Sequence, residues 1–194
     1  MTSTLSTGII TRSVLAGERR DEVLHFEASE SGLDQYSVLT EIMHLVDMRF
    51  GVSHEGWTRE SARLFAIDTA MTVVRRNLIS LPEVERQTIA ARLQEARTLV
   101  VGDRDDELGF IQAALETQLG LTPVGQERRV WLTAIDALIP NPFRAALIST
   151  RNALAIGTSE AFTDLGILLR ERLIARLDEG ILNSGPPNTL FLTA

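Results

Sequence analysis

Residues 58–79 read TRESARLFAIDTAMTVVRRNLI, and they form the most strongly marked helix of this 194-residue chain. Thr58 can cap the helix, and Glu60 lies in its first turn, where a carboxylate is favourable. The apolar residues form two stripes at helical spacing, namely Ala62, Phe65, Ala66 and Val73, and Leu64, Ile67, Met71, Val74 and Leu78. A helix that is apolar around so much of its circumference is buried, so we expect it at the centre of the fold.

Further helical segments flank this stretch on both sides. Two are expected between residues 18 and 51, and the later ones end at Gly102, near Gly120, before Pro140, at Gly157 and at Gly180. Asp103 is expected to cap the helix that follows Gly102. The pattern predicts an all-α fold of about eight helices, arranged as a single bundle or as stacked helix pairs.

The domain organisation follows from composition. Residues 1–17 show no helical period and are expected to form a flexible or extended arm, residues 18–180 a single helical domain, and residues 181–194 an extended tail. No apolar run approaches the roughly 18 to 20 residues of a membrane span, and no secretory signal is recognisable. We therefore expect a cytoplasmic protein that does not bind membranes.

Missing residue types exclude several chemistries. The chain has no cysteine, so disulfides, thiolate metal sites and cysteine catalysis are excluded. All 19 basic residues are arginine, which excludes Schiff-base chemistry and a P-loop lysine. The sequence also lacks a nucleophile elbow, a dinucleotide-binding glycine pattern and a zinc helix motif. We expect no enzymatic activity and no cofactor.

The charge is uneven along the chain. The net charge is -7, and residues 1–57 carry nine acidic residues against four arginines. A local acidic surface can attract a basic partner, although it also serves simply to keep a helix solvated. The predicted partner-binding residues are Asp21, Glu22, Glu27, Glu30 and Asp34. The acidic balance argues against nucleic-acid binding.

Two Glu-x-x-His pairs offer an alternative. Glu22 and His25, and likewise Glu41 and His44, are three residues apart, so each pair shares one face of a helix. Di-iron bundles use two such pairs together with further glutamates from other helices. The alternative hypothesis is therefore a small carboxylate and histidine metalloprotein, against which surface or capping histidines are the simpler interpretation.

Two acids lie inside apolar helices. Asp68 and Asp136 are each surrounded by apolar residues at helical spacing. A buried carboxylate requires a partner, and a nearby arginine would supply one. Structural pairing is the expected role of both.

Residues 62–157 resemble a helical domain found in proteins described as immunity proteins and in uncharacterised proteins of actinobacteria and planctomycetes. The residues that carry the resemblance are Arg63-Leu-Phe-Ala66 with Ala70 and Val74, residues 86–97, Gly102-Asp103, Ala113-Ala114, Ala134 and Asn141-Pro-Phe-Arg144. The resemblance covers about half of the chain. Such families often have Cys and Trp near the Phe-Ala motif, where this chain has Ile67, Asp68 and Thr69.

Together these features predict a non-catalytic helical protein-binding module. The resemblance implies a more specific role, that of an immunity-type protein that neutralises a partner by occlusion. A second hypothesis is a structural or assembly subunit of a phage or bacterial particle that forms oligomers through its terminal arms.

Overall fold

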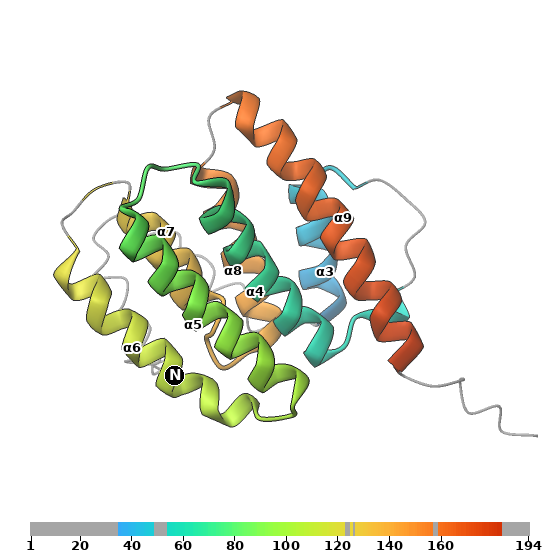
Figure 1. The fold of residues 1–194 in the computed structure, drawn as a ribbon. Coiled ribbons are helices and arrows are strands. Elements are labelled where there is room, and N and C mark those ends of the chain that lie inside the picture. The colour runs from blue at the N-terminus through green and yellow to red at the C-terminus, as the bar shows by residue number, and fades with distance from the viewer. Residues whose placement is uncertain (1–34, 49–53, 123–124, 126, 157–158, 184–194) are drawn as a thin grey trace, which may run out of the picture. The chain divides into compact units, whose positions relative to one another are not determined.

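The computed structural model describes residues 35–48, 54–122, 125, 127–156 and 159–183 (Figure 1). These ranges contain seven α-helices, two short 3-10 helices and no strand, which confirms the all-α prediction. The elements are α3 (Gln35–Leu45), η1 (His54–Gly56), α4 (Arg59–Arg76), α5 (Glu83–Val101), η2 (Asp105–Glu107), α6 (Leu108–Leu121), α7 (Glu127–Asp136), α8 (Pro142–Ile156) and α9 (Ser159–Asn183).

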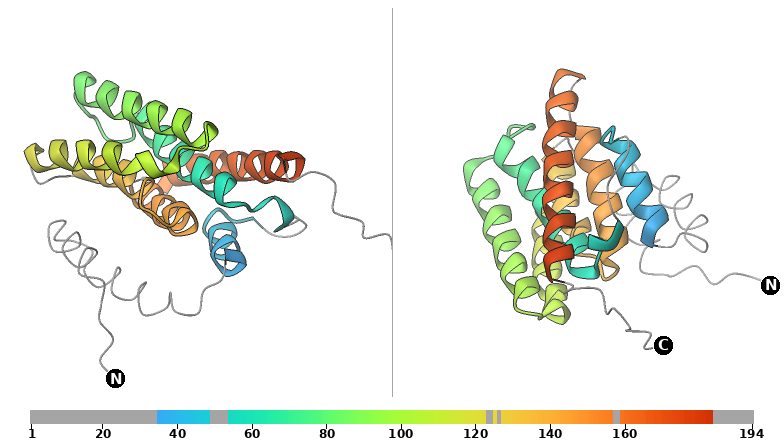
Figure 2. Two further views of the ribbon diagram at one scale, coloured as in Figure 1. Left: turned by 90° about the horizontal axis from the view of Figure 1, so that it is seen from below. Right: turned by 90° about the vertical axis from the view of Figure 1, so that its right-hand side faces the viewer.

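Helix α4 lies at the centre of the bundle, as its two apolar stripes predict. Thr58 caps it in a capping box, because the Thr58 side chain accepts from the Ser61 N–H at 3.0 Å and the Ser61 hydroxyl accepts from the Thr58 N–H at 2.7 Å. Asn77 ends the helix in the left-handed conformation, with φ of 47°. Every residue from Ser61 to Val74 is buried, and α4 packs against α5, α7, α8 and α9 (Figures 1 and 2).

A buried arginine fastens α4 to the end of α7. The Arg63 guanidinium donates to the carbonyl oxygens of Ala137 at 3.1 Å and Pro140 at 2.8 Å, and the residue is only 2% exposed. Burial lowers the pKa of Arg63 to about 10, which leaves it charged at neutral pH. The carbonyls that receive this charge follow the C-terminus of α7, the end of a helix that favours cations.

The two acids predicted to be paired inside helices do have partners. Asp68 of α4 accepts from Arg176 of α9, with Nε of the arginine 2.7 Å from Oδ2. Asp136 at the end of α7 accepts from the Asn152 side-chain amide at 2.6 Å. Asp68 therefore has the predicted arginine, and the contact links α4 to α9.

The turn between α5 and α6 differs from the prediction. Asp103 does not cap a helix, because it takes the left-handed conformation itself, with φ of 55°, directly after the C-cap residue Gly102. The 3-10 helix η2 follows, and α6 begins only at Leu108. The predicted cap at Asp103 is wrong because this residue belongs to the turn that ends α5. The Asp103 N–H donates to the Val100 carbonyl at 3.1 Å, and the Arg104 N–H donates to the Leu99 carbonyl at 2.9 Å.

The last helix continues past Gly180, where the sequence predicts its end, and stops at Asn183. A Cβ atom added at Gly180 would collide with the backbone carbonyl of Gly56, and one at Gly56 would collide with that of Leu177. The two glycines let the backbones of η1 and α9 touch. Gly180 is thus a contact residue rather than a helix stop, and the predicted tail is helical in its first three residues.

Two tryptophans complete the core at separate places. The Trp57 indole donates to the Gln35 carbonyl at 2.9 Å and lies against the rings of Phe65 and Phe143. The Trp131 indole on α7 donates to the carboxylate of Glu85 on α5, also at 2.9 Å. Both indoles are 2% exposed, so each has its polar atom satisfied inside an apolar setting.

None of the described helices combines the length and the apolar character that a membrane span requires.

Candidate protein-binding surfaces

The partner-binding residues predicted from the charge pattern lie outside the described residues. They are Asp21, Glu22, Glu27, Glu30 and Asp34, and His25 also falls in this part of the chain. The acidic N-terminal segment therefore stays a prediction.

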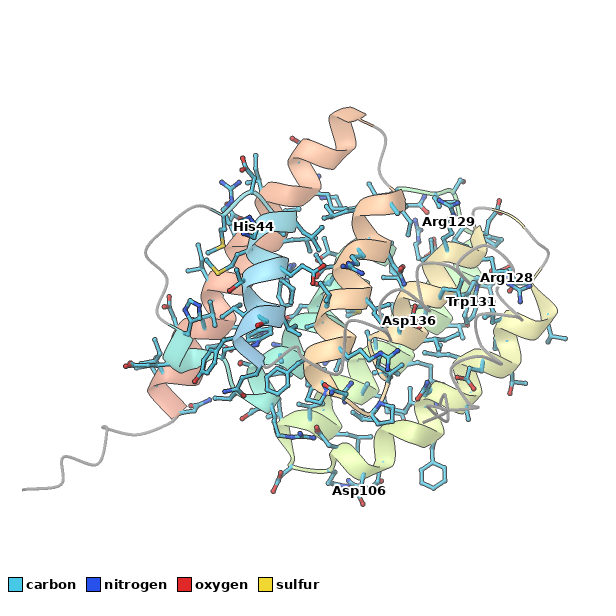
Figure 3. The ribbon with its side chains drawn as sticks, turned by 180° about the vertical axis from the view of Figure 1, so that it is seen from behind. His44, Asp106, Arg128, Arg129, Trp131 and Asp136 are labelled. Atoms are coloured by element: carbon cyan, nitrogen blue, oxygen red, sulfur yellow. The ribbon has the colours of Figure 1, made fainter. Side chains whose placement is uncertain are left out.

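The second Glu-x-x-His pair lies on the last turns of α3. Glu41 forms an ion pair with Arg151 of α8, which ties α3 to the bundle, while His44 is exposed (Figure 3). His54, the third histidine, contacts the ring of Tyr36 in a tilted arrangement, with 5.7 Å between ring centroids and 43° between the ring planes. Within the described ranges no group of three or more His, Cys, Asp or Glu is arranged to hold a metal ion.

Helix α9 carries a second apolar stripe on its outer side. Leu165, Leu169 and Leu173 face inwards and are buried. Ile167, Ile174 and Ile181 repeat every seventh residue and are 45%, 39% and 38% exposed. A spacing of seven returns to almost the same side of an α-helix, so the three isoleucines form one line.

Exposed carboxylates alternate with these isoleucines. Asp164, Glu171 and Asp178 each lie three or four residues from an isoleucine, so they share its side of the helix. None of the three has an ion-pair partner among the described residues. We call these three acids and the three isoleucines the α9 stripe. It combines apolar contact area with exposed negative charge.

A pocket opens on another part of the bundle, between α5 and the start of α6. Its volume is about 390 Å³. Its apolar lining comes from Leu99, Phe110 and Ile111, and Glu95, Arg104 and Glu107 contribute the polar part. Arg104 donates to Glu107 at 2.5 Å and 2.6 Å, and this hydrogen bond lowers the pKa of Glu107. Phe110 is 80% exposed, so the pocket has an apolar rim.

Sequence reasoning missed both surfaces. The heptad spacing of isoleucine in residues 167–181 is visible in the sequence, but the parallel run of leucines in residues 165–173 is equally regular. Only packing decides which run is buried. The acidic residues that follow Asp103 are visible in the sequence as the first turn of a helix, but the pocket beside them is not, because its lining comes from both α5 and the start of α6.

Comparison of the chain with known protein families, with curated proteins and with solved structures gives no match.

Proposed function

We propose that this protein is a non-catalytic helical module that binds another protein, and that the α9 stripe receives an amphipathic helix carrying basic residues. The observation that carries the proposal is the alternation of three exposed isoleucines with three exposed carboxylates along one line of α9. An amphipathic helix laid along such a line buries its apolar side chains at heptad spacing.

The charge on the stripe specifies the partner. Two α9 stripes packed on one another would bring like-charged carboxylates together, which is unfavourable. A helix with arginine or lysine beside its apolar residues would neutralise Asp164, Glu171 and Asp178 instead. Opposite charges of this kind select the partner and speed its association.

The acidic N-terminal segment fits the same partner. Asp21, Glu22 and Glu27 would attract a basic protein at long range, while the isoleucines of α9 would hold it after contact. Binding of this kind can neutralise a partner by covering its functional surface, as the resemblance to immunity proteins implies.

The test uses a synthetic helical peptide about three heptads long with leucine at the core positions and arginine at the flanking ones. Its matched control has glutamate in place of each arginine. We expect the arginine peptide to bind the full-length protein with micromolar affinity and the glutamate peptide not to bind. Ile174→Glu should weaken binding at least about tenfold by raising the dissociation rate.

Two further variants separate the surfaces. Val84→Glu alters an exposed apolar residue of α5, 75% exposed, and should leave binding unchanged. Reversing Asp21, Glu22 and Glu27 to arginine should slow association in a salt-dependent manner without raising the dissociation rate. Equal binding of the two peptides, no binding at about 100 µM, or an Ile174→Glu variant that binds normally would each refute the proposal.

A further inference from the structure

Helix α6 has an uncharged apolar line on its outer side. Phe110, Ala114, Thr117 and Leu121 are spaced by four, three and four residues, which places them within about 60° of arc around the helix. Phe110 is 80% and Leu121 77% exposed. The Thr117 hydroxyl donates to the Ala113 carbonyl at 2.9 Å and so is satisfied within its own helix. We call these four residues the α6 line.

No charged side chain interrupts this line. Glu116 is the one charged residue between Leu108 and Leu121, and it lies about 120° around the helix from Phe110. Its carboxylate also accepts from Gln112 at 3.2 Å. Phe110 and Leu121 are among the most exposed large apolar side chains of the described residues, and exposed apolar residues that share one line of a helix offer a surface for packing against another helix.

The two ends of α6 carry opposite charge. The acidic turn, residues 103–107, precedes the helix, and its Asp103, Asp105 and Asp106 are exposed. At the other end, Arg128 and Arg129 lie in the first turn of α7, where they outnumber Glu127. The Arg128 guanidinium is 3.5 Å from the Thr122 carbonyl oxygen at the end of α6, and the Arg129 guanidinium is 3.5 Å from the Ala155 carbonyl oxygen of α8. Figure 3 shows Asp106 and Arg128 at opposite ends of this helix.

We propose that two copies of this chain form a symmetric dimer by antiparallel packing of α6 on α6. A two-fold axis through the middle of the helix places the acidic turn of each copy beside the first turn of α7 of the other copy, which contains the two arginines. The interface therefore contains two equivalent charge contacts. A parallel arrangement would bring the two acidic turns together and is therefore disfavoured.

The shape of the α6 line suits the same arrangement. Its large residues, Phe110 and Leu121, lie at the two ends, and its small ones, Ala114 and Thr117, lie in the middle. In the antiparallel pair small residues face small residues, so the helices approach closely. Each Phe110 then meets the partner subunit's Leu121, which is placed to enter the pocket beside Phe110, lined by Leu99 and Ile111.

The dimer is expected to be weak. One helix pair is at the lower end of the size range of specific interfaces, so a dissociation constant of about 10 to 100 µM is expected. Sedimentation velocity of the full-length protein between about 5 µM and about 500 µM should show a monomer passing into a dimer. Phe110→Glu and Leu121→Glu should each hold it as a monomer with an unchanged circular dichroism spectrum.

Charge exchange provides a sharper test. Asp105→Arg with Asp106→Arg should weaken the dimer about tenfold, and Arg128→Glu with Arg129→Glu should do the same. The chain that carries all four changes should regain the dimer, because the ends are again complementary. A merely structural role for these side chains would make the four changes additive, and that outcome would overturn the proposal.

Because the chain has no cysteine, single introduced cysteines can show directly which helix lies in the dimer interface. A chain with Thr117→Cys should form covalent dimers with a short thiol-reactive crosslinker, and a chain with Ile174→Cys on α9 should not. A monomer throughout the concentration range contradicts the proposal. So does a dimer that survives Phe110→Glu but is lost when residues 1–17 or 181–194 are deleted, because such a dimer would form through the terminal arms.

Discussion

At Asp68 a carboxylate in the middle of the most buried helix meets the guanidinium of Arg176, and the side chains are 8% and 10% exposed. Arg176 also pairs with Glu179 at the edge of the core, and the Arg97 side chain lies 3.9 Å from Asp68. Taking both charges out of water is costly, and their mutual attraction offsets that cost only while both are present. The pair therefore constrains how α9 can dock on α4.

Removing one member of this pair should destabilise the fold strongly. Asp68→Asn or Arg176→Met should each cost about 3 to 5 kcal/mol, because the charge that remains buried loses its main partner and keeps only Glu179 or Arg97 nearby, whereas Asp68→Leu combined with Arg176→Met should cost much less than the sum. Urea unfolding followed by circular dichroism measures all three. Arg104→Gln, which breaks the exposed pair with Glu107, serves as the control and should leave the unfolding midpoint unchanged. Single variants within about 1 kcal/mol of the parent would contradict this account.

At the scale of the helix, α9 contains two glycines in different surroundings. A Cβ atom added at Gly180 meets the Gly56 backbone, and one added at Gly166 meets nothing within 4 Å. Both positions are helical, so helix propensity alone favours alanine at each by about 1 kcal/mol. Gly166→Ala should accordingly stabilise the protein, while Gly180→Ala should destabilise it. Thermal unfolding gives the sign of each change, and two changes of the same sign would disprove the contact role of Gly180.

The central position of α4 leads to a second prediction at the level of a single helix. Phe65 is fully buried and packs on Trp57. Phe65→Ala should cost about 3 to 5 kcal/mol through lost burial and the cavity left behind. The exposed Val84 of α5 provides the reference, since Val84→Ala should have almost no effect in the same denaturant series. A loss below about 1 kcal/mol for Phe65→Ala would mean that α4 is peripheral.

Helix α4 could be predicted from sequence because its capping residue and its apolar stripes lie within one continuous segment. Thr58 caps it, and its two apolar stripes require burial on both sides. The function of Gly180 could not be predicted, because a glycine near a helix end is a common stop signal and the touching residue, Gly56, is 124 positions away. For the same reason the α9 stripe was missed, since local pattern cannot tell which of two regular apolar lines meets the core.

For the molecule as a whole, the described residues belong to one compact unit that begins at Gln35. The unit has its own core around α4, and its first helix is held by the Glu41 ion pair with Arg151 and by the Trp57 contact with Gln35. A chain of residues 35–194 should therefore fold with the same cooperative transition as the full-length protein. Loss of helical circular dichroism or a broad, non-cooperative transition in this shorter chain would show that residues 1–34 are needed for the core.

The separate settings of the two indoles have a practical consequence for spectroscopy. Trp57 senses the junction of α3, η1 and α4, and Trp131 senses the packing of α7 on α5, so each is an intrinsic optical probe of a different region. Both should emit at short wavelength in the native state, and the spectra should shift to the red on exposure to water. Variants that keep one indole, Trp57→Phe and Trp131→Phe, would follow the two regions separately during unfolding. Fluorescence could thus reveal, without any added dye, whether the α3 side of the bundle opens before the α5 and α7 side.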